Sequence, residues 1–506
     1  MFPKPAADLR PNTLDFEIKP LIKATGFREY DARWWFGVPG HKTPPELNLL
    51  GVTALGMGIG TLLGEFGVKR DVVTGHDFRA YSSSIKNALI VGLMASGCRV
   101  HDIGMAVTPM AYFAQFALDV PAVAQVTASH NENGWTGVKM GSRRPVTFGP
   151  EEIGRLKDIV LGATFDLKPG GEYIFEENFA ERYITDLTNR PKLKRPIRVV
   201  AACGNGTAGA FAPRVLTAIG ADVVQMDTDL DYTFPHYNPN PEDLEMLHAM
   251  SKRVLAEKAE VGLGFDGDGD RCGVIDNTGD EIFADKVGVM LARDLSALHP
   301  GSTFVVDVKS TGLFKTDPVL QKNGVTADYW KTGHSYIKRR VNELGALAGF
   351  EKSGHYFFNK PIGRGYDDGL VSALAILDML DRNPGKTMAD LKDALPKTWG
   401  SPTMAAHCAD EIKYSVADKV RDRFTVMQAK GEKVSGHAIA DLVTVNGVRV
   451  VADDGTWGLV RASSNKPELV VVVESPVSEA RMREMFKVVD TVLRENPSVG
   501  AYNQTI

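Results

Sequence analysis

Three stretches of the chain share one pattern of apolar and polar positions. Residues 72–104, 197–227 and 303–334 each begin with a short β-branched run, followed by a Gly/Ser/Thr-rich loop, a helix-length amphipathic stretch, a glycine and a second apolar run. The glycines are Gly97, Gly220 and Gly324, which stand where a helix C-cap is expected. The pattern predicts three related strand–helix–strand units with mostly parallel sheets.

Each unit is followed by one more apolar run that ends in an unusual loop. These segments read VAQVTASHNENG, VGLGFDGDGDR and ALAGFEKSGHYFF. In open α/β sheets, ligands gather at the carboxyl ends of the strands, so we expect the three loops to line one cleft. A fourth region follows the break LPKTWGSPT and contains expected strands at 450–452 and 469–474 and a helix at 478–494.

The expected fold is therefore α/β, with three related mixed α/β domains around a central cleft plus a C-terminal α+β domain. The predicted domains are residues 1–175, 176–283, 284–394 and 395–506.

Composition narrows the class of protein. The chain has 506 residues, 43% hydrophobic and 24% charged, which is typical of soluble globular proteins. A net charge of -5 is small for this length, so neither a nucleic acid nor a membrane surface is the expected partner. The four cysteines form no CxxC pair, which argues against zinc and disulfides and favours a reducing cytosol. With no apolar h-region at the start and no apolar run of roughly 20 residues, we expect a cytoplasmic protein.

Three carboxylates alternate with glycines directly after the apolar run 261–265. Asp266, Asp268 and Asp270 can turn inward on a tight bend, and their hard oxygen ligands suit Mg²⁺ or Ca²⁺. An EF-hand is excluded because its sixth and twelfth loop positions hold Arg271 and Asn277 in place of Gly and Glu. A solvent-exposed acidic turn is the less favoured alternative. Arg271 suits a phosphate bound to the metal, or else it only neutralises the carboxylates.

A second candidate loop, Thr127–Asn131, ends an apolar strand. Ser129 is a possible nucleophile, with His130 and Lys139 near it in sequence to move protons. Taken alone, the commoner interpretation is a capping or turn serine. No Gly-x-Ser-x-Gly elbow is present, so a hydrolase of that type is not indicated.

The order of the motifs is more specific than any one of them. TASHNENGWTGVK, GFDGDGDR, FEKSGHYFF and GLVRASSNKPELV occur in this order, with FREYDARW near the start and KTGHSYIKRR at 331–340. The set resembles the α-D-phosphohexomutase family over nearly the whole chain, and is most similar to its bacterial phosphomannomutase/phosphoglucomutase branch. The resemblance implies reversible interconversion of hexose 1-phosphate and hexose 6-phosphate, of mannose and/or glucose, through a phosphoserine enzyme and a 1,6-bisphosphate intermediate.

The resemblance also implies roles for individual residues. Ser129 carries the phosphate and binds Mg²⁺ together with the three aspartates, Lys139 is the general acid/base, and glucose or mannose 1,6-bisphosphate is the activator. The remaining implied catalytic residues are Arg33, Arg271, His130, His334 and His355. The implied substrate-binding residues are Tyr30, Lys309, Glu351 and Ser353 around the sugar and Arg461, Ser463, Ser464 and Asn465 around the distal phosphate. The chain departs from the family pattern at Trp34, Phe350, Lys352, Asn465 and Lys466.

Several alternatives stay open at this point. A phosphoglucosamine mutase usually has Gln where this chain has Lys352. A non-catalytic sugar-phosphate sensor would have lost the serine or an aspartate, and neither is lost. A metal phosphatase needs no distal phosphate anchor, so the 461–465 loop counts against it. The expected partner is a hexose phosphate, the expected oligomeric state is monomer or dimer, and the preferred sugar is undecided.

Overall fold

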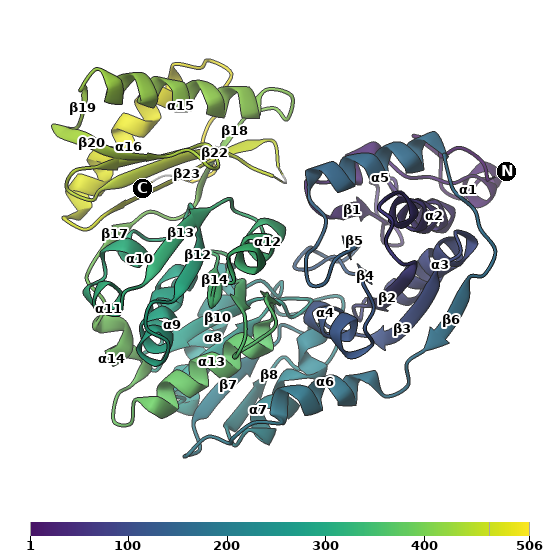
Figure 1. Cartoon of the computed structure of the whole chain (residues 1–506), viewed down its shortest axis with the longest axis horizontal. Coiled ribbons are helices and arrows are strands. Elements are labelled where there is room, and N and C mark those ends of the chain that lie inside the picture. Colours follow the sequence, from purple (N-terminus) through teal and green to yellow (C-terminus); the bar gives the residue numbers. More distant parts are fainter. Residues whose placement is uncertain (1, 465, 505) are drawn as a thin grey trace. The chain divides into compact units, whose positions relative to one another are not determined.

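The computed structural model describes residues 2–464, 466–504 and 506. The chain divides into two compact units (Figure 1): the first unit is Met1–Ile282 with Ser353–Met388, and the second unit is Phe283–Lys352 with Ala389–Ile506. The backbone therefore passes from one unit to the other three times. Among the described helices, none combines the length and the apolar character needed to span a bilayer.

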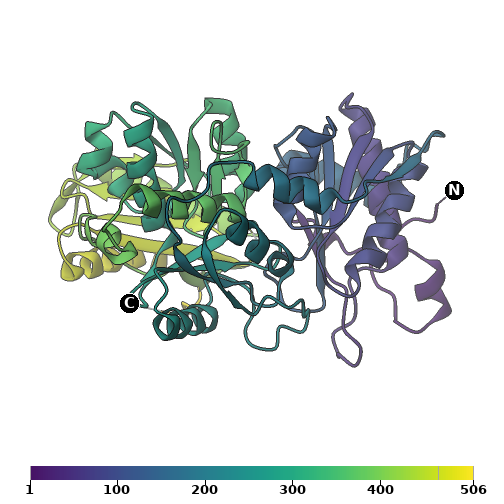
Figure 2. The same cartoon turned by 90° about the horizontal axis from the view of Figure 1, so that it is seen from below.

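The first unit contains a six-stranded sheet in the order β1-β5-β4-β2-β3-β6. The pairs β2–β3, β2–β4 and β3–β6 are parallel, whereas β5 and β1 run antiparallel at one edge. Helices flank the strands (Figure 2), and α2, α3 and α5 share the main apolar core with the sheet. The bounds are β1 (Ala32–Trp35), β2 (Asp71–His76), β3 (Arg99–Met105), β4 (Ala122–Val126), β5 (Trp135–Gly141), β6 (Glu172–Phe175), α1 (Leu14–Ile18), η1 (Ala24–Gly26), α2 (Leu49–Glu65), α3 (Ser82–Ala95), α4 (Thr108–Ala117) and α5 (Pro150–Gly162).

A second sheet of the first unit has the order β11-β10-β9-β7-β8. Strands β8, β7 and β9 are parallel, and β10 and β11 fold back antiparallel. The later part of the unit adds an antiparallel hairpin, β15–β16, and a helix, α13, that Asp368 caps by accepting from the N–H groups of Leu370 and Val371. The bounds are β7 (Arg198–Ala202), β8 (Asp222–Met226), β9 (Val261–Phe265), β10 (Cys272–Asp276), β11 (Glu281–Ile282), β15 (Tyr356–Phe358), β16 (Tyr366–Asp367), α6 (Phe179–Thr188), η2 (Thr207–Ala210), α7 (Ala212–Ala218), α8 (Leu244–Glu257) and α13 (Gly369–Arg382).

The second unit combines parallel and antiparallel strands. Strand β12 pairs in parallel with β13 and β14, while the C-terminal part is an antiparallel sheet in the order β17-β23-β22-β21-β20-β19, with β18 also on β23. Helices α15 and α16 cover one face of the C-terminal sheet (Figure 1) and share its core. The bounds are β12 (Thr303–Asp307), β13 (Thr326–Trp330), β14 (Ala348–Phe350), β17 (Trp399–Gly400), β18 (Met404–His407), β19 (Lys433–Val434), β20 (His437–Val443), β21 (Val448–Ala452), β22 (Trp457–Ala462), β23 (Glu468–Ser475), α9 (Ala284–Leu298), α10 (Leu313–Thr316), α11 (Pro318–Lys322), α12 (His334–Leu344), α14 (Met388–Asp393, at the third crossing), α15 (Lys413–Ala429) and α16 (Glu479–Arg494).

The predicted fold class is confirmed, since mixed α/β sheets precede an antiparallel C-terminal sheet. All three repeated stretches form a strand, helical residues and a parallel strand. In the third stretch the single expected helix is two short helices, because Pro318 lacks an N–H and starts a new helix that Asp317 caps. The four predicted domain ranges stay a prediction.

Candidate active site

Ser129 lies in the loop that follows β4 and is almost completely buried. Its φ of +52° is in the left-handed region, which residues other than glycine rarely adopt. The backbone N–H of Ser129 donates to Thr127 Oγ1 at 2.9 Å, which holds this conformation. Strain of this kind is concentrated at functional sites because it persists only where surrounding contacts enforce it.

Arg79 supplies much of that support, and the sequence did not single it out. Its guanidinium donates to the carbonyl oxygens of Ser129 at 3.2 Å, Asn131 at 2.5 Å and Glu132 at 2.9 Å. Its Nε donates to Asp77 Oδ2 at 3.2 Å, so the arginine is itself fixed. The signal that could have revealed it is the sequence DFR (residues 77–79) directly after β2, where an acid and a base follow the carboxyl end of a central strand.

The three aspartates lie on the tight loop after β9, and each is fully buried. One carboxylate oxygen from each lies within 4.8 Å of the others. Asp266 Oδ1 accepts from the N–H groups of Asp270 at 3.1 Å and Arg271 at 3.2 Å, which folds the loop inward. Oδ1 of Asp268 and Oδ1 of Asp270 are buried without a hydrogen-bond partner. This set of hard, partly unsatisfied oxygens fits a divalent cation such as Mg²⁺.

The serine loop and the aspartate loop touch. Ser129 Oγ donates to Asp266 Oδ2 at 3.3 Å. Their backbones are also close, because a Cβ added at Gly267 would lie 2.4 Å from the carbonyl oxygen of Ser129. A glycine is therefore required at 267 for this approach.

Lys139 enters the same cluster from β5. Its Nζ donates to Asp268 Oδ2 at 2.8 Å and forms an ion pair with Asp270 Oδ2. Thr108, at the start of α4, donates its hydroxyl to Asp268 Oδ2 at 2.6 Å. Burial lowers the pKa of Lys139, but the charges of Asp268 and Asp270 outweigh burial and raise the pKa above its usual range. The lysine is therefore a positively charged proton donor in this arrangement.

The pKa values of Asp266 and Asp268 are shifted in opposite directions. Burial, and then the charges of Asp270 and Asp268, raise the pKa of Asp266 well above its usual range. For Asp268 burial acts in the same direction, but the charge and hydrogen bond of Lys139 dominate and lower its pKa. The surroundings thus disfavour the charged form of Asp266 and favour that of Asp268.

Two further predicted residues lie at the serine loop, His130 within it and Arg33 in contact with it. His130 Nδ1 lies 3.3 Å from Ser129 Oγ, and burial, followed by the charges of Arg271 and Arg33, lowers the pKa of His130 well below its usual range. Arg33, on β1, donates to Asp31 Oδ2 at 2.9 Å and to Asn131 Oδ1 at 3.0 Å. Tyr30 is buried just before this strand.

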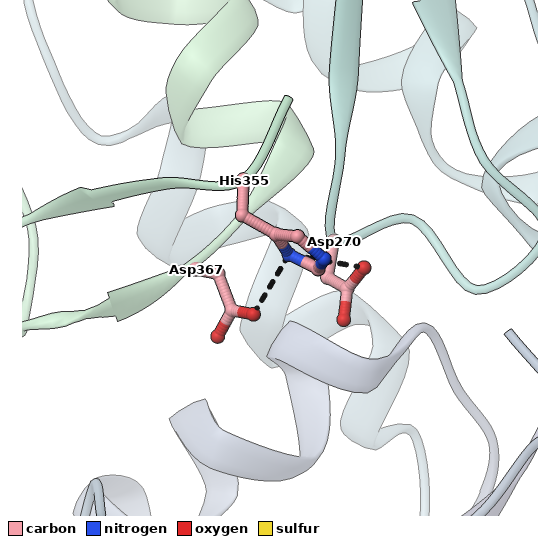
Figure 3. A group of neighbouring side chains, drawn as sticks. All are labelled: Asp270, His355 and Asp367. Atoms are coloured by element: carbon pink, nitrogen blue, oxygen red, sulfur yellow. Dashed lines mark ion pairs between the residues drawn. The ribbon is translucent and has the colours of Figure 1, made fainter. Parts of the chain in front are cut away.

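Arg271 and His355 meet beside the aspartates. Arg271 Nε donates to His355 Nε2 at 2.9 Å, and Arg271 Nη1 lies 3.3 Å from Glu242. The other ring nitrogen, His355 Nδ1, lies 3.0 Å from Asp367 Oδ2 and 3.6 Å from Asp270 Oδ1 (Figure 3). Ser353, also in the first unit, is half-buried two residues before His355. The first unit therefore brings the serine, its predicted acid/base, the aspartates, two arginines and two histidines into one connected group.

Other predicted residues belong to the second unit. Glu351 is buried and accepts a hydrogen bond from the Gly333 N–H, which precedes His334 at the start of α12. Lys309 follows β12, with its Nζ 4.0 Å from Asp307 Oδ2. Arg449, which the sequence did not single out, donates to the carbonyls of Val308 at 3.0 Å and Ser310 at 2.6 Å and so fixes the backbone on both sides of Lys309.

The predicted distal-phosphate loop follows β22. Arg461 is largely buried and donates to the Ala462 carbonyl at 2.8 Å, while Ser463 Oγ accepts from the Lys466 N–H at 3.3 Å. Ser464 is half-buried in the same loop, and Asn465 lies outside the described residues.

Comparisons with known proteins cover almost the entire chain. Models of phosphoglucomutase/phosphomannomutase α/β/α domains I, II and III match residues 25–166, 181–279 and 283–399, and the model of the C-terminal domain matches residues 411–492. A phosphomannomutase/phosphoglucomutase of Pseudomonas syringae pv. tomato is 33% identical over 90% of this chain and 93% of its own. A phosphoglucomutase of Neisseria gonorrhoeae is 31% identical over 93% and 97%. The crystal structure of a phosphoglucomutase/phosphomannomutase family protein of Burkholderia thailandensis superposes with a TM-score of 0.82 at 30% identity, over 94% of this chain and 98% of that one.

Proposed function

The chain belongs to the phosphoglucomutase/phosphomannomutase family, and on that basis we propose that it interconverts hexose 1-phosphates and hexose 6-phosphates of glucose and mannose. The single observation that carries the assignment to this site is the contact of Ser129 Oγ with Asp266, inside a buried cluster of three carboxylates that Lys139 joins. A serine held against a cation site is suited to phosphoryl transfer, where catalysis is largely positioning and electrostatics.

In the first half-reaction, the bond between phosphorus and Oγ of phosphorylated Ser129 breaks as a bond forms to the free hydroxyl of the hexose monophosphate. The hydroxyl loses its proton, and Oγ gains one. The resulting 1,6-bisphosphate turns, and its other phosphate returns to Ser129 with the opposite proton movements. Mg²⁺ held by Asp266, Asp268 and Asp270 would neutralise charge on the transferring group.

The proton donors and acceptors follow from the charges of this site. Asp268 and Asp270 hold Lys139 in its protonated form, so its Nζ carries a proton that can pass to Oγ as the phosphoserine bond breaks. His130 has a lowered pKa and lies 3.3 Å from Oγ, so it suits proton acceptance when the free serine attacks. Arg33 and Arg271 would stabilise the phosphoryl charge.

For substrate selection we propose that Glu351 and Ser353 bind a vicinal diol of the sugar without contacting the 2-position. This arrangement accepts both gluco and manno epimers. Tyr30, Lys309, Arg461, Ser463, Ser464 and Asn465 would bind the rest of the substrate, with the 461–465 loop at the phosphate that is not reacting. His334 and His355 are the further catalytic residues of the proposal. We also propose a cytoplasmic location and activation by glucose or mannose 1,6-bisphosphate.

A coupled assay tests the proposal with the full-length protein and Mg²⁺. Glucose 1-phosphate and mannose 1-phosphate are supplied side by side, with and without glucose 1,6-bisphosphate. We expect both sugars to be converted to 6-phosphates and the bisphosphate to raise the initial rate by phosphorylating Ser129. Release of inorganic phosphate without isomerisation would instead indicate a phosphatase, and conversion of glucosamine 1-phosphate alone would indicate the alternative mutase.

A further inference from the structure

Asp367 is a fully buried carboxylate that the preceding mechanism does not use. It ends β16, and the antiparallel register places it opposite Phe357, two residues beyond His355. Its Oδ2 lies 3.0 Å from His355 Nδ1, and a dashed line in Figure 3 marks this ion pair. The hairpin therefore fixes a carboxylate against one nitrogen of a predicted active-site histidine.

The opposite ring nitrogen is fixed by Arg271. The Nε–H of Arg271 donates to His355 Nε2 at 2.9 Å, and the backbones of the two residues form an isolated antiparallel bridge. An arginine cannot act as an acceptor, so His355 Nε2 must present its lone pair. The ring proton therefore lies on Nδ1, which faces Asp367 and, at 3.6 Å, Asp270.

We propose that Asp367 is a positioning residue, which holds His355 in the Nδ1–H tautomer so that Nε2 can hold the guanidinium of Arg271. The inference rests on the proposed function, because it concerns how the guanidinium of Arg271 is oriented toward the transferring phosphate. A carboxylate that orients an imidazole through one nitrogen commonly determines what the other nitrogen can do.

The position of Arg271 explains why its orientation matters. Its backbone N–H donates to Asp266 Oδ1 at 3.2 Å, and its Nε lies 3.7 Å from Asp266 Oδ2. Arg271 thus lies between His355 and the first carboxylate of the cation loop. With Nε bound to the imidazole and Nη1 bound to Glu242 at 3.3 Å, Nη2 remains to donate to a phosphoryl oxygen.

A second cation site is the other interpretation of Asp270, His355 and Asp367, whose ligand atoms lie within 4.8 Å of one another. One contact counts against it. Arg271 Nε donates to His355 Nε2, so Nδ1, the nitrogen that faces both carboxylates, carries the ring proton and has no lone pair for a cation.

The kinetic test compares Asp367→Asn with Asp368→Asn in the coupled mutase assay. An asparagine at 367 can present its N–H₂ group to Nδ1 and favour the wrong tautomer, so we expect kcat to fall about 10- to 100-fold with little change in KM. Asp368 caps α13, and asparagine caps a helix equally well, so Asp368→Asn should keep wild-type kcat. A kcat for Asp367→Asn within about twofold of wild type, well below the factor expected for loss of an orienting partner, would overturn the inference.

The second test does not depend on turnover. In protein labelled with ¹⁵N-histidine, the His355 ring signals are assigned by their loss in His355→Gln. We expect the Nδ1–H tautomer in the wild type and a shift toward Nε2–H in Asp367→Asn. An Nε2–H tautomer in the wild type would overturn the inference, even if Asp367→Asn fails to fold. Failure of the proposed function is distinguishable, because a wild-type protein without mutase activity still reports its tautomer.

Discussion

At the scale of single residues, the site depends on two backbone features, the conformation of Ser129 and the close approach of two loops at Gly267. Ser129 adopts a left-handed φ, which is supported by the hydrogen bond that its N–H donates to Thr127 Oγ1 and by the one that its carbonyl accepts from Arg79. Gly267 leaves room for the Ser129 carbonyl to approach the aspartate loop. The absence of a side chain at position 267 thus allows the nucleophile to lie close to the cation site.

Gly267→Ala tests this close approach. The new Cβ would lie 2.4 Å from the Ser129 carbonyl oxygen, so one loop must move. We expect a loss of about 1–3 kcal/mol of stability from overpacking and a fall of about 100-fold in kcat/KM, the effect of a misplacement of about 1 Å. Urea unfolding and the mutase assay measure the two effects.

Gly154→Ala is the matched control for that substitution. Gly154 lies within α5, and a Cβ there meets nothing within 4 Å. The alanine should leave activity unchanged and stabilise the helix by up to about 1 kcal/mol. If Gly267→Ala behaved like Gly154→Ala, the closeness of the two loops would have no role in activity.

Asp268→Asn tests the cation loop at constant side-chain shape. Asp268 Oδ2 accepts from Thr108 and Lys139, and its Oδ1 is buried without a partner. Removing the charge should raise the Mg²⁺ concentration needed for half-maximal rate and lower the maximal rate by about 100-fold or more, since a bound metal contributes several kcal/mol to charge stabilisation. Mg²⁺ titration of the rate measures this, and an unchanged circular dichroism spectrum controls for the fold. An unaltered Mg²⁺ response would exclude Asp268 as a ligand.

At the scale of elements, the reactive loops follow the carboxyl ends of buried strands. Ser129 comes after β4 and the aspartates after β9, as the sequence pattern predicted. The second unit adds an element-scale feature that the pattern did not predict. Glu474 on β23 is buried and accepts from Lys286 on α9, from Thr311 and the Gly312 N–H beyond β12, and from Trp457 on β22. This carboxylate joins the C-terminal sheet to the α/β part of the same unit.

The Glu474 contacts predict a pH dependence of stability. Burial raises the pKa of Glu474, but Lys286, the Gly312 N–H and Thr311 outweigh burial and lower it from 4.5 to about 2. A lowered folded-state pKa stabilises the fold above the unfolded pKa, and the contribution is lost as pH falls through the folded pKa. The shift corresponds to about 3 kcal/mol, present above pH 4.5 and lost toward pH 2.

Glu474→Gln isolates this contribution from the other carboxylates. The variant should be less stable than wild type at pH 6 by an amount on the order of 3 kcal/mol, and the difference should shrink at pH 3. Urea unfolding at the two pH values gives the comparison. A difference that is the same at both would show that Glu474 is not charged in the fold.

At the scale of the whole molecule, the chain is two compact units that the backbone joins three times. The aspartate cluster belongs to the first unit and the Glu474 network to the second. Ligands and substitutions at these two places therefore act on different units.

Mg²⁺ should stabilise the first unit. A cation that binds only the folded cluster contributes about 2.7 kcal/mol at 100 times its Kd. Calorimetry with Mg²⁺ and with EDTA should show a higher unfolding midpoint with the metal, and Asp268→Asn should lose most of that difference. Glu474→Gln should keep it, because its site lies in the other unit. A Mg²⁺ effect of equal size in both variants would argue against the aspartate cluster as the binding site.

The sequence by itself determined the fold class, the three strand–helix–strand units, the loops that carry Ser129 and the aspartates, and the family. These depend on local signals, namely apolar periodicity and turn residues, which are readable within a short window. Tertiary structure decided the contacts between distant residues. Arg79 supports a serine 50 residues away, Arg271 meets His355 across 84 residues, and Glu474 accepts from Thr311 across 163. Packing brings such pairs together, and no periodicity in the sequence records it, which is why Asp367, Glu474 and the partners of Arg79 could not be found from the sequence alone.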